Sequence, residues 1–419
     1  MTAPDGAAAA FPGGRSAALE RLVALKPGTY ARSRNFLDGA VSRLSPYLRH
    51  GMLDLAEVRD AAVGRSGAAA SSKFVFELAW RDYWRRVYAE LGDRVWEDLE
   101  PYATGHAASS YAAELPEDIV RGETGDVCID GFVRGLVDGG YVHNHARMWF
   151  ASYVVHHRRV RWQSGAAFYL EHLLDGDPAS NNLSWQWVAG TFSREPYFFN
   201  RGNLERYTTG RYCAVCPKAG NGCPFEATYP ELERRLFARD AARPRPSFRL
   251  SAPPDPEGGP PEAPPAGGAI VWHHVEALSP STAARAAAPG APALVTLDPA
   301  GMASREAWAP QRTAFVRACA EACEATVAEG AAVAEVRAFA ERHGARRVLV
   351  DASADPLIRA QIRELGTSLD VTVIPARPFA RLPKGGDLGR FSRYWRTAKR
   401  TAFGVEDEAK ALSLWNDAN

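Results

Sequence analysis

The 419-residue sequence lacks long apolar runs and carries almost no net charge. No stretch approaches the roughly 18 consecutive apolar residues of a membrane-spanning helix. The Ala-rich start has no basic region before an apolar core, so no secretory signal is predicted. We therefore expect a cytoplasmic protein without a membrane partner. Because 50 Lys and Arg accompany 49 Asp and Glu, a polycation that holds nucleic acid by bulk charge is excluded.

Proline and glycine are concentrated in residues 243–268, RPRPSFRLSAPPDPEGGPPEAPPAGG. A segment of this composition forms a semi-extended linker rather than a folded unit. It predicts four parts of the chain: a helical domain at 1–242, the linker at 243–268, an α/β domain at 269–404 and a tail at 405–419.

The two sides of this linker differ in pattern. Before it, residues 73–91 and 142–162 are long, aromatic and too polar for strands, which predicts helices. After it, short apolar runs predict strands at 269–275, 293–297, 346–352 and 371–375, and the segments at 304–330, 333–343 and 355–366 between them predict helices. The expected fold class is an all-helical domain followed by a Rossmann-like α/β domain with a parallel sheet. The usual dinucleotide fingerprint, G-x-G-x-x-G, is missing after the first strand.

Positive charge is concentrated between Arg377 and Arg400, where eight basic residues accompany one acid, Asp387. Three aromatic residues are interleaved with them: Phe391, Tyr394 and Trp395. Such a run could contact phosphates. The alternative, which the pattern favours, is a solvated helix face whose aromatic side chains pack on the protein body.

The segment 173–190, LLDGDPASNNLSWQWVAG, concentrates acids, amides and tryptophans, which indicates a ligand pocket. Asp175 and Asp177 fit the first positions of a calcium loop, but Ala179 and Ser180 do not fit the next ones. A simpler alternative, in which the amides cap the helix that carries Trp185 and Trp187, accounts for one or two of these residues only.

Four segments in a fixed order resemble the FAD-binding domain of the DNA photolyase and cryptochrome family. They are GAVSRLSPYLRHG (39–51), FELAWRDYW (76–84), GYVHNHARM (140–148) and VRWQSGAAFYLEHLLDGDPASNNLSWQW (160–187). The resemblance implies a monomeric deoxyribodipyrimidine photolyase, a carbon-carbon lyase that binds UV-damaged DNA and uses blue light and reduced FAD to split cyclobutane pyrimidine dimers. A cryptochrome photoreceptor and a (6-4) photolyase are the alternatives.

The resemblance also implies residues that bind FAD. A pyrophosphate favours hydroxyls and backbone N–H groups, and the family's phosphate-binding positions correspond to Tyr30, Ser42, Arg43, Leu44 and Ser45. Val41 stands where a Thr is usual. Beside the flavin ring, the resemblance implies an Arg147–Asp175 pair, Asp177 facing the adenine side and Asn181 facing flavin N5.

For substrate and electron transfer, the family's positions fall on further residues. Glu77, Trp80 and Arg81 share one helix face because they are three or four residues apart; a plain aromatic core is the alternative for that face. The lesion-binding positions correspond to Glu77, Trp80, Arg81, Asn144, His145, Met148 and Trp187, with His145 in place of the usual Arg. Trp185 and Trp162 match the first two members of the tryptophan chain, and Trp149 or Tyr153 could be the third.

Cysteine is scarce, with six residues, yet three of them are close together. Cys213, Cys216 and Cys223 follow a C-x2-C-x6-C spacing, and Cys128 is the only other cysteine before the linker. This set resembles the iron-sulfur bacterial branch of the photolyases, which implies a [4Fe-4S] cluster. Four thiolates equally suit structural zinc, which is the alternative.

The order of the domains is reversed relative to the family, in which an α/β antenna domain comes first. Residues 271–280, VWHHVEALSP, and residues 344–365, GARRVLVDASADPLIRAQIREL, resemble parts of that domain. We therefore expect a permuted, antenna-type domain at 269–404, a change that a long linker permits. Its antenna chromophore is left unassigned.

Overall fold

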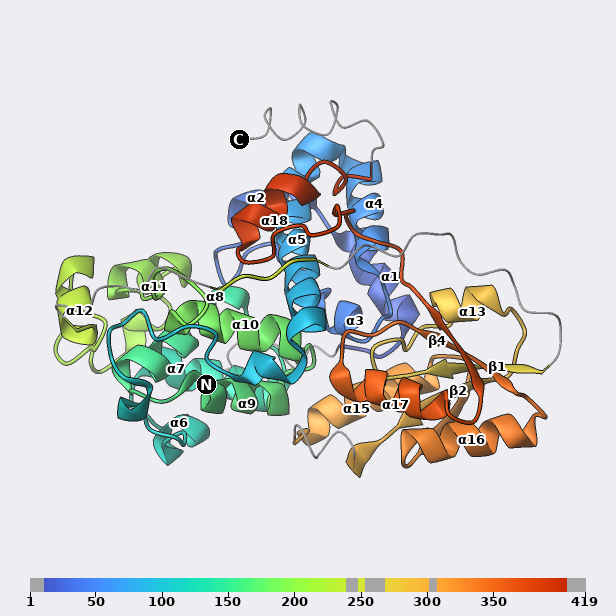
Figure 1. The fold of residues 1–419 in the computed structure, drawn as a ribbon. Helices are drawn as coiled ribbons and strands as arrows, with labels where there is room; N and C mark the ends of the chain where they lie inside the picture. The colour runs from blue at the N-terminus through green and yellow to red at the C-terminus, as the bar shows by residue number, and fades with distance from the viewer. Residues whose placement is uncertain (1–10, 239–247, 253–267, 301–306, 405–419) are drawn as a thin grey trace. The chain divides into compact units, whose positions relative to one another are not determined.

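The computed structural model describes residues 11–238, 248–252, 268–300 and 307–404 (Figure 1). The predicted tail at 405–419 and most of the predicted linker lie outside these residues. Contacts divide the chain into two compact units. Among the described residues, the helical unit contains Arg32–Val41 and those within 93–248, and the sheet unit contains Phe11–Ala31, Ser42–Gly92 and those within 249–404. The predicted boundaries at 242 and 268 stay a prediction, and the two units are described separately below.

The sheet unit is built on five parallel strands in the order β3-β2-β1-β4-β5, which confirms the Rossmann-like α/β fold. The strands are β1 (Ala269–His273), β2 (Ala293–Leu297), β3 (Thr326–Glu329), β4 (Arg347–Asp351) and β5 (Asp370–Ile374). In the register, Val271 pairs with Ala293 on one side and with Leu349 on the other. The four strands expected from apolar runs are therefore present.

Strand β3 corrects the expectation of a helix over residues 304–330. In that range the structure has α15 (Pro310–Glu321), then Glu324 with a φ of 55°, then the short strand. None of the four β3 side chains is fully buried, and β3 lies at the sheet edge. A strand without a buried apolar run has no signal that separates it from the end of an Ala-rich helix.

Helices cover both faces of the sheet (Figure 1). Ile270 and Trp272 point to the face covered by α16 (Ala332–Arg342) and α17 (Pro356–Leu365). Val271, between them, packs on the other face with α13 (Ala283–Ala287). This alternation follows from the period of two along a strand, and burial on both faces explains the continuous apolar runs of these strands.

Further helices complete the sheet unit: α1 (Arg15–Ala24), α2 (Pro27–Ser33, which ends at the unit boundary), α3 (Ser45–Arg49), α4 (Leu55–Ser66), α5 (Ala68–Leu91) and α18 (Phe391–Ala398). The single helix predicted over 73–91 is thus α5. Helix α18 packs on α5 through aromatic rings, because Phe391 stacks on Trp80 with centroids 3.6 Å apart and an interplanar angle of 8°. The aromatic residues of the basic run 377–400 therefore pack on the protein body, as the favoured alternative predicts.

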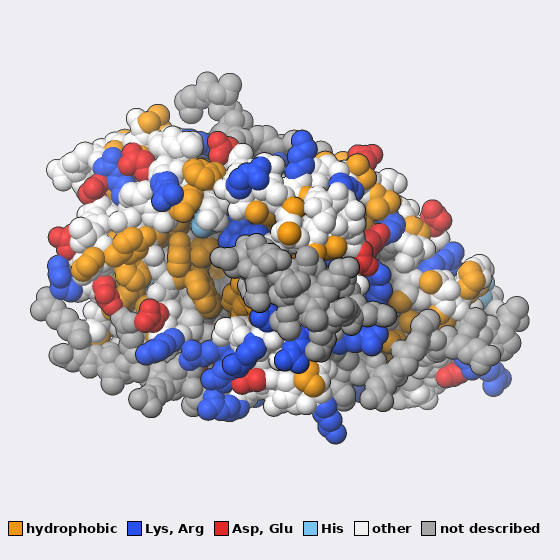
Figure 2. Space-filling view, turned by 90° about the horizontal axis from the view of Figure 1, so that it is seen from above, with side chains coloured by type: hydrophobic (Ala, Val, Ile, Leu, Met, Phe, Trp, Pro, Cys, Tyr) orange, Lys and Arg blue, Asp and Glu red, His pale blue; other side chains and the backbone are white. Residues whose placement is uncertain are grey.

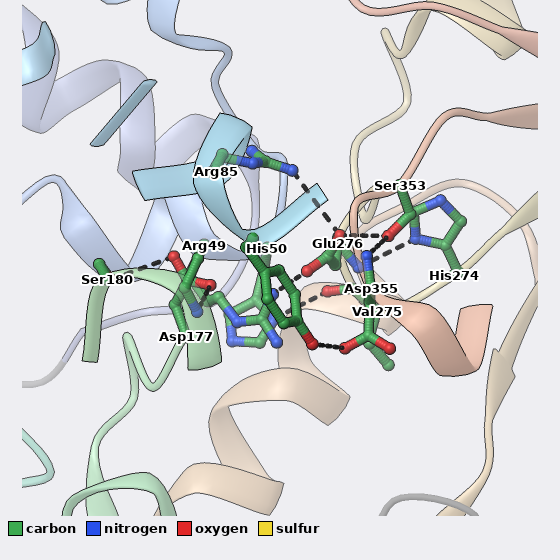
Figure 3. Close-up of polar contacts among 12 residues, drawn as sticks. Arg49, His50, Arg85, Asp177, Ser180, His274, Val275, Glu276, Ser353 and Asp355 are labelled. Carbon is green, nitrogen blue, oxygen red and sulfur yellow. Dashed lines mark hydrogen bonds and ion pairs between the residues drawn. The ribbon is translucent and has the colours of Figure 1, made fainter. Parts of the chain in front are cut away.

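The loop after β1 is fixed to α3 and α5 by a buried ionic cluster (Figure 3). Glu276 forms an ion pair with Arg49, lies 3.7 Å from Arg85 and accepts a hydrogen bond of 2.6 Å from Ser353. Only 6% of the Arg49 side chain and 5% of the Glu276 side chain are exposed. Although burial by itself raises the pKa of Glu276, Arg49 and Arg85 lower it well below its ordinary value. No local sequence pattern predicts this cluster, because its members lie far apart along the chain.

The helical unit is built from seven α-helices and three shorter helical turns within its described residues. They are η2 (Ala108–Ser110), α6 (Glu117–Arg121), α7 (Val127–Gly139), α8 (Asn144–Ser152), η3 (Tyr153–His157), α9 (Trp162–His172), α10 (Pro178–Ala189), α11 (Arg201–Tyr207), η4 (Cys213–Val215) and α12 (Tyr229–Leu236). A short 3-10 turn, η1 (Gly92–Trp96), begins at the unit boundary. The core of the unit is aromatic, and Trp149, Phe150, Trp162 and Phe199 are at most 1% exposed.

The helix predicted over residues 142–162 is broken, which corrects that expectation. Helix α8 continues as a π-type turn at Tyr153–His157, and the chain then leaves the helix, with Arg159 at a φ of 53°. Helix α9 starts anew at Trp162. Among the described residues, no helix has both the length and the apolar character needed to cross a membrane.

Candidate functional site

The predicted Arg147–Asp175 pair forms inside the helical unit. Nη2 of Arg147 lies 3.0 Å and 2.9 Å from the two Asp175 carboxylate oxygens, and its Nε donates to the Val142 carbonyl at 2.7 Å. Asp175 is buried. Burial by itself lowers the pKa of Arg147, but the Asp175 carboxylate, together with Tyr141, more than compensates, so this pKa is raised. The guanidinium is therefore held in one orientation by a carbonyl and a carboxylate.

Asp177 and Asn181 lie on the first turns of α10. The Asp177 carboxylate caps the helix by accepting from the Ala179 N–H at 3.2 Å and from the Ser180 hydroxyl at 3.1 Å. The cap of α10 is thus this carboxylate, whereas the capping alternative predicted an amide. The Asn181 amide donates to the Ala166 carbonyl of α9 at 3.0 Å and to the Asn182 side chain at 3.1 Å. These bonds fix the plane of the Asn181 amide group.

Trp185 lies in a tight contact between α10 and α9. A Cβ added to Gly165 would come within 2.2 Å of the Trp185 ring, so only glycine permits this approach. The ring also meets Tyr169 edge to face, with centroids 5.2 Å apart. Trp162 is fully buried at the start of α9, and its indole N–H donates to Asp98 at 2.6 Å.

The two candidates for a third redox residue are also buried. The indole N–H of Trp149 donates to Asn203 at 3.2 Å, and the Tyr153 hydroxyl accepts from Arg158 at 3.1 Å. Neither contact distinguishes one candidate from the other.

The predicted lesion-binding residues of α8 occupy its first turns. Asn144 is exposed, and its amide lies 3.5 Å from the Met148 sulfur, one turn later. The His145 ring stacks on Trp149 and Tyr207, with centroids 5.4 and 5.0 Å away. Its Nδ1 also lies 2.6 Å from the Asn35 carbonyl oxygen. His145 therefore has a packing role in addition to the role predicted for it.

Trp187, on α10, is half-buried and stacks on Tyr197 with centroids 5.6 Å apart. The contact leaves part of the indole accessible on the surface of the helical unit. A partly exposed indole plane is consistent with a stacking surface.

The predicted phosphate-binding residues belong to the sheet unit. Arg43 has a left-handed φ of 51°, and the Leu44 N–H lies 3.4 Å from the Ser42 hydroxyl, so the segment turns tightly before α3. Ser45 is the first residue of that helix. Tyr30 packs edge to face on Phe74, with centroids 5.1 Å apart.

Glu77, Trp80 and Arg81 share one face of α5, as their spacing predicts. Glu77 forms an ion pair of 2.9 Å with Lys73. Phe391, from the C-terminal part of the chain, covers one face of the Trp80 ring. Trp84 and Tyr83 also contact the Trp80 ring, with centroids 5.1 and 6.0 Å away.

All four predicted metal-ligating cysteines line one pocket of the helical unit. The pocket is lined by Cys128, Cys213, Cys216 and Cys223 together with Asp126, Arg201, Leu204, Tyr212, Ala219 and Phe225. Burial raises the pKa of the Cys128, Cys213 and Cys223 thiols. Arg201 hydrogen-bonds Cys213 and opposes that shift. Within the described ranges, no three His, Cys, Asp or Glu side chains are close enough together to hold a metal ion.

A second cavity lies in the sheet unit, at the carboxyl ends of β1 and β2. It encloses about 560 Å³ together with its open mouth, and its lining includes Arg49, Trp272, His274, Asp298 and Asp355. Open parallel sheets commonly bind ligands at this edge. None of these residues belongs to a site predicted from the sequence.

Comparison with known proteins places the helical residues in a family. Residues 74–210 match the family model described as the FAD binding domain of DNA photolyase. These residues are an FAD-binding domain of the photolyase and cryptochrome family. The recognition made from the four sequence segments is thereby confirmed.

Relatives and solved structures of this family cover only part of the chain. A deoxyribodipyrimidine photo-lyase of Streptomyces griseus is 40% identical over 152 residues, which is 36% of this chain and 32% of that protein. A cryptochrome DASH of Idiomarina loihiensis is 30% identical over 208 residues, or 47% of this chain and 46% of that protein. The crystal structure of a class III photolyase from Agrobacterium tumefaciens matches with a TM-score of 0.43 and 23% identity, over 53% of this chain and 54% of that one. The chain thus spans a third to a half of the relatives' length.

Proposed function

We propose that the protein is a light-dependent DNA photolyase that splits cyclobutane pyrimidine dimers. The observation that carries this proposal is the buried Arg147–Asp175 ion pair, which lies in the matched FAD-binding domain. In this proposal bound FAD, in its reduced form, supplies the light-driven electron, and the protein supplies binding, orientation and electrostatics.

The residues of the helical unit suit a flavin ring. Arg147 offers a fixed positive charge. The two N–H groups of Asn181 are already donated to Ala166 and Asn182, so its amide oxygen is the atom left to accept a hydrogen bond, and it does so without ionising. Asp177 is assigned to the adenine side. In the sheet unit, the tight turn at Ser42–Ser45, together with Tyr30, is assigned to the phosphates, since it offers hydroxyls and N–H groups.

The lesion-binding residues are assigned by their chemistry. Glu77 and Arg81 would hydrogen-bond the pyrimidine edge, and Asn144, His145 and Met148 would contact the same lesion. Trp80 and Trp187 would each offer an aromatic plane to a flipped pyrimidine pair. Lys and Arg side chains gather on the face drawn in Figure 2, with acidic side chains among them, and such local charge supports binding to DNA phosphates.

For the cysteine pocket we propose a [4Fe-4S] cluster held by Cys128, Cys213, Cys216 and Cys223. The support is that residues 85 positions apart, Cys128 and Cys213, line the same pocket. A thiolate-only set suits iron-sulfur clusters and zinc equally. Iron and acid-labile sulfide analysis of the purified protein decides between them, because zinc without sulfide would refute the cluster and leave the flavin proposal intact.

A cryptochrome photoreceptor is the second candidate function. It is favoured by the similarity to a cryptochrome DASH and by His145, which stands where an Arg contacts the lesion in the family. Such a protein would reduce its flavin in light without repairing DNA.

Repair of a dimer-containing oligonucleotide tests the proposal. Reduced protein is illuminated with blue light, and restored thymines are followed by the recovery of absorbance. We expect repair by the wild type and a strong loss in the Glu77→Gln variant, with Glu117→Gln, an exposed residue of α6, as control. Light-dependent flavin reduction without any repair by the reduced protein would refute the photolyase and favour the photoreceptor or a (6-4) substrate.

A further inference from the structure

The indole of Trp162 is fully buried, but its N–H is hydrogen-bonded to an exposed carboxylate. The side chain is 0% exposed, and its N–H donates to Oδ1 of Asp98 at 2.6 Å. Asp98 itself is exposed, in the loop after η1, and Gln163 donates to the same oxygen at 3.1 Å. A short hydrogen bond to an ionised acceptor is among the stronger ones. Asp98 thus lies between the buried nitrogen and solvent.

Trp162 also lies on the same helix face as the contact made by Trp185. Trp162 and Gly165 are three residues apart on α9 and therefore share a face. The Trp185 ring lies against Gly165, where an added Cβ would be 2.2 Å from it. The surroundings of Trp185 are aromatic, with Tyr169 and Phe150 at centroid distances of 5.2 and 6.2 Å. The ionic partner of these two tryptophans is thus Asp98, which contacts Trp162.

We propose that Asp98 is the proton acceptor that converts oxidised Trp162 to a neutral radical. The inference rests on the proposed function and on the tryptophan chain implied by the family resemblance, in which Trp185 gives an electron to photoexcited oxidised FAD. Trp162 then gives one electron to Trp185, which restores Trp185 and leaves Trp162 as a radical cation. Its N–H bond breaks, an O–H bond forms on Asp98, and the proton passes from the exposed carboxyl group to water. An external thiol reductant later returns the electron, and solvent returns the proton.

The carboxylate determines how long the charge separation lasts. A positive charge on the Trp162 ring is attracted to the adjacent carboxylate, which favours movement of the electron from Trp162 to Trp185. Once the proton has left, Trp162 is restored only when it regains both an electron and a proton. Charge recombination is therefore slowed.

Flash photolysis of the FAD-loaded, oxidised protein tests this role, with tryptophan radical absorption as the readout. Asp98→Asn keeps an oxygen that accepts the indole N–H but removes the base. We expect the wild type to convert its radical cation to the neutral radical, more slowly in D2O, and the variant to retain the cation and recombine at least about tenfold faster. Glu97→Gln removes the neighbouring exposed carboxylate, 3.5 Å from Arg94, and should behave as wild type.

A second measurement needs neither light nor flavin. Ultraviolet resonance Raman reports the strength of the indole hydrogen bond, and the Trp162→Phe variant identifies the band. We expect the band to shift toward weaker bonding in Asp98→Asn. Deprotonation of Trp162 in that variant with wild-type kinetics would overturn the inference while leaving the proposed function standing. Absence of any tryptophan radical in the FAD-loaded wild type would overturn the electron path of both.

Discussion

The Glu276 cluster offers the sharpest test of how the sheet unit is stabilised. Glu276 follows β1, whereas its partners Arg49 and Arg85 belong to α3 and α5 (Figure 3). The same loop is held by His50, whose Nδ1 lies 2.8 Å from the Val275 carbonyl oxygen. Replacing Glu276 by Gln keeps an oxygen that can accept from Ser353 and removes only the charge. The variant therefore isolates the ionic contribution.

The expected loss follows from the burial of the two charges. Only 6% of the Arg49 side chain is exposed, so bulk water cannot solvate its charge once the carboxylate charge is removed. Removing one partner of a buried ion pair costs about 3–5 kcal/mol. Arg85 is 35% exposed, so its ion pair contributes less than that of Arg49. We therefore expect the variant to lose about 3 kcal/mol of unfolding free energy. For a unit of this size that corresponds to a fall in Tm of about 6–12 °C.

Urea unfolding followed by far-UV circular dichroism measures this loss. The matched control is Glu329→Gln, which makes the same substitution in an exposed ion pair with Arg317, and its midpoint should stay close to that of the wild type. A Glu276→Gln midpoint equal to that of Glu329→Gln would refute the reasoning, since it would mean that the cluster contributes no more than a surface pair.

The pH dependence gives an independent check. The folded pKa of Glu276 lies well below 4.5, the ordinary value in the unfolded chain. The contribution of the Glu276 charge to stability is therefore complete above pH 4.5, and it is lost as the pH falls from 4.5 toward the folded pKa. The difference between wild type and Glu276→Gln should be largest at pH 6–8 and should shrink below about pH 4.5. A constant difference down to pH 3 would contradict the ionic origin.

Three further predictions concern buried contacts. Gly165→Ala should cost about 1–3 kcal/mol, measured by thermal unfolding, because its Cβ would overlap the Trp185 ring. Phe391→Ala should cost about 3 kcal/mol in calorimetry, since a ring that is 7% exposed and stacked on Trp80 is lost. Burial lowers the pKa of His156 to about 3, so stability should fall as pH drops from 6.5 toward 3, and His156→Gln should flatten that fall in urea midpoints.

Matched variants control these predictions. Gly64→Ala lies on α4 with no atom near the added Cβ, so its Tm should be unchanged or higher. Val23→Ala removes a side chain that is 69% exposed on α1 and should change stability by less than about 0.5 kcal/mol. Equal stability of Gly165→Ala and Gly64→Ala would show that the close contact at Gly165 does not affect stability. Equal stability of Phe391→Ala and Val23→Ala would show that the Phe391 ring contributes no stability. An unaltered pH profile in His156→Gln would mean that this histidine is not buried in its neutral form.

Local sequence determined much of the fold and the type of the site residues. Apolar runs located β1, β2, β4 and β5. In β1, β2 and β4 these runs reflect burial on both faces, whereas β5 lies at the sheet edge with Val373 43% exposed. The family resemblance, carried by short segments, recognised the FAD-binding domain that residues 74–210 match. It also named Arg147 and Asp175, which the structure brings together.

Tertiary structure decided the contacts that modify those residues. Asp98 lies 64 positions before Trp162, Phe391 lies 311 positions after Trp80, and Glu276 lies 227 positions after Arg49. The strand β3 and the break between α8 and α9 were likewise missed, since neither has a distinctive local pattern. A sequence pattern reports which faces of a segment are apolar, and this determines secondary structure and burial. It does not report which distant side chain will meet a buried N–H, ring or guanidinium, because that depends on how all the elements pack together.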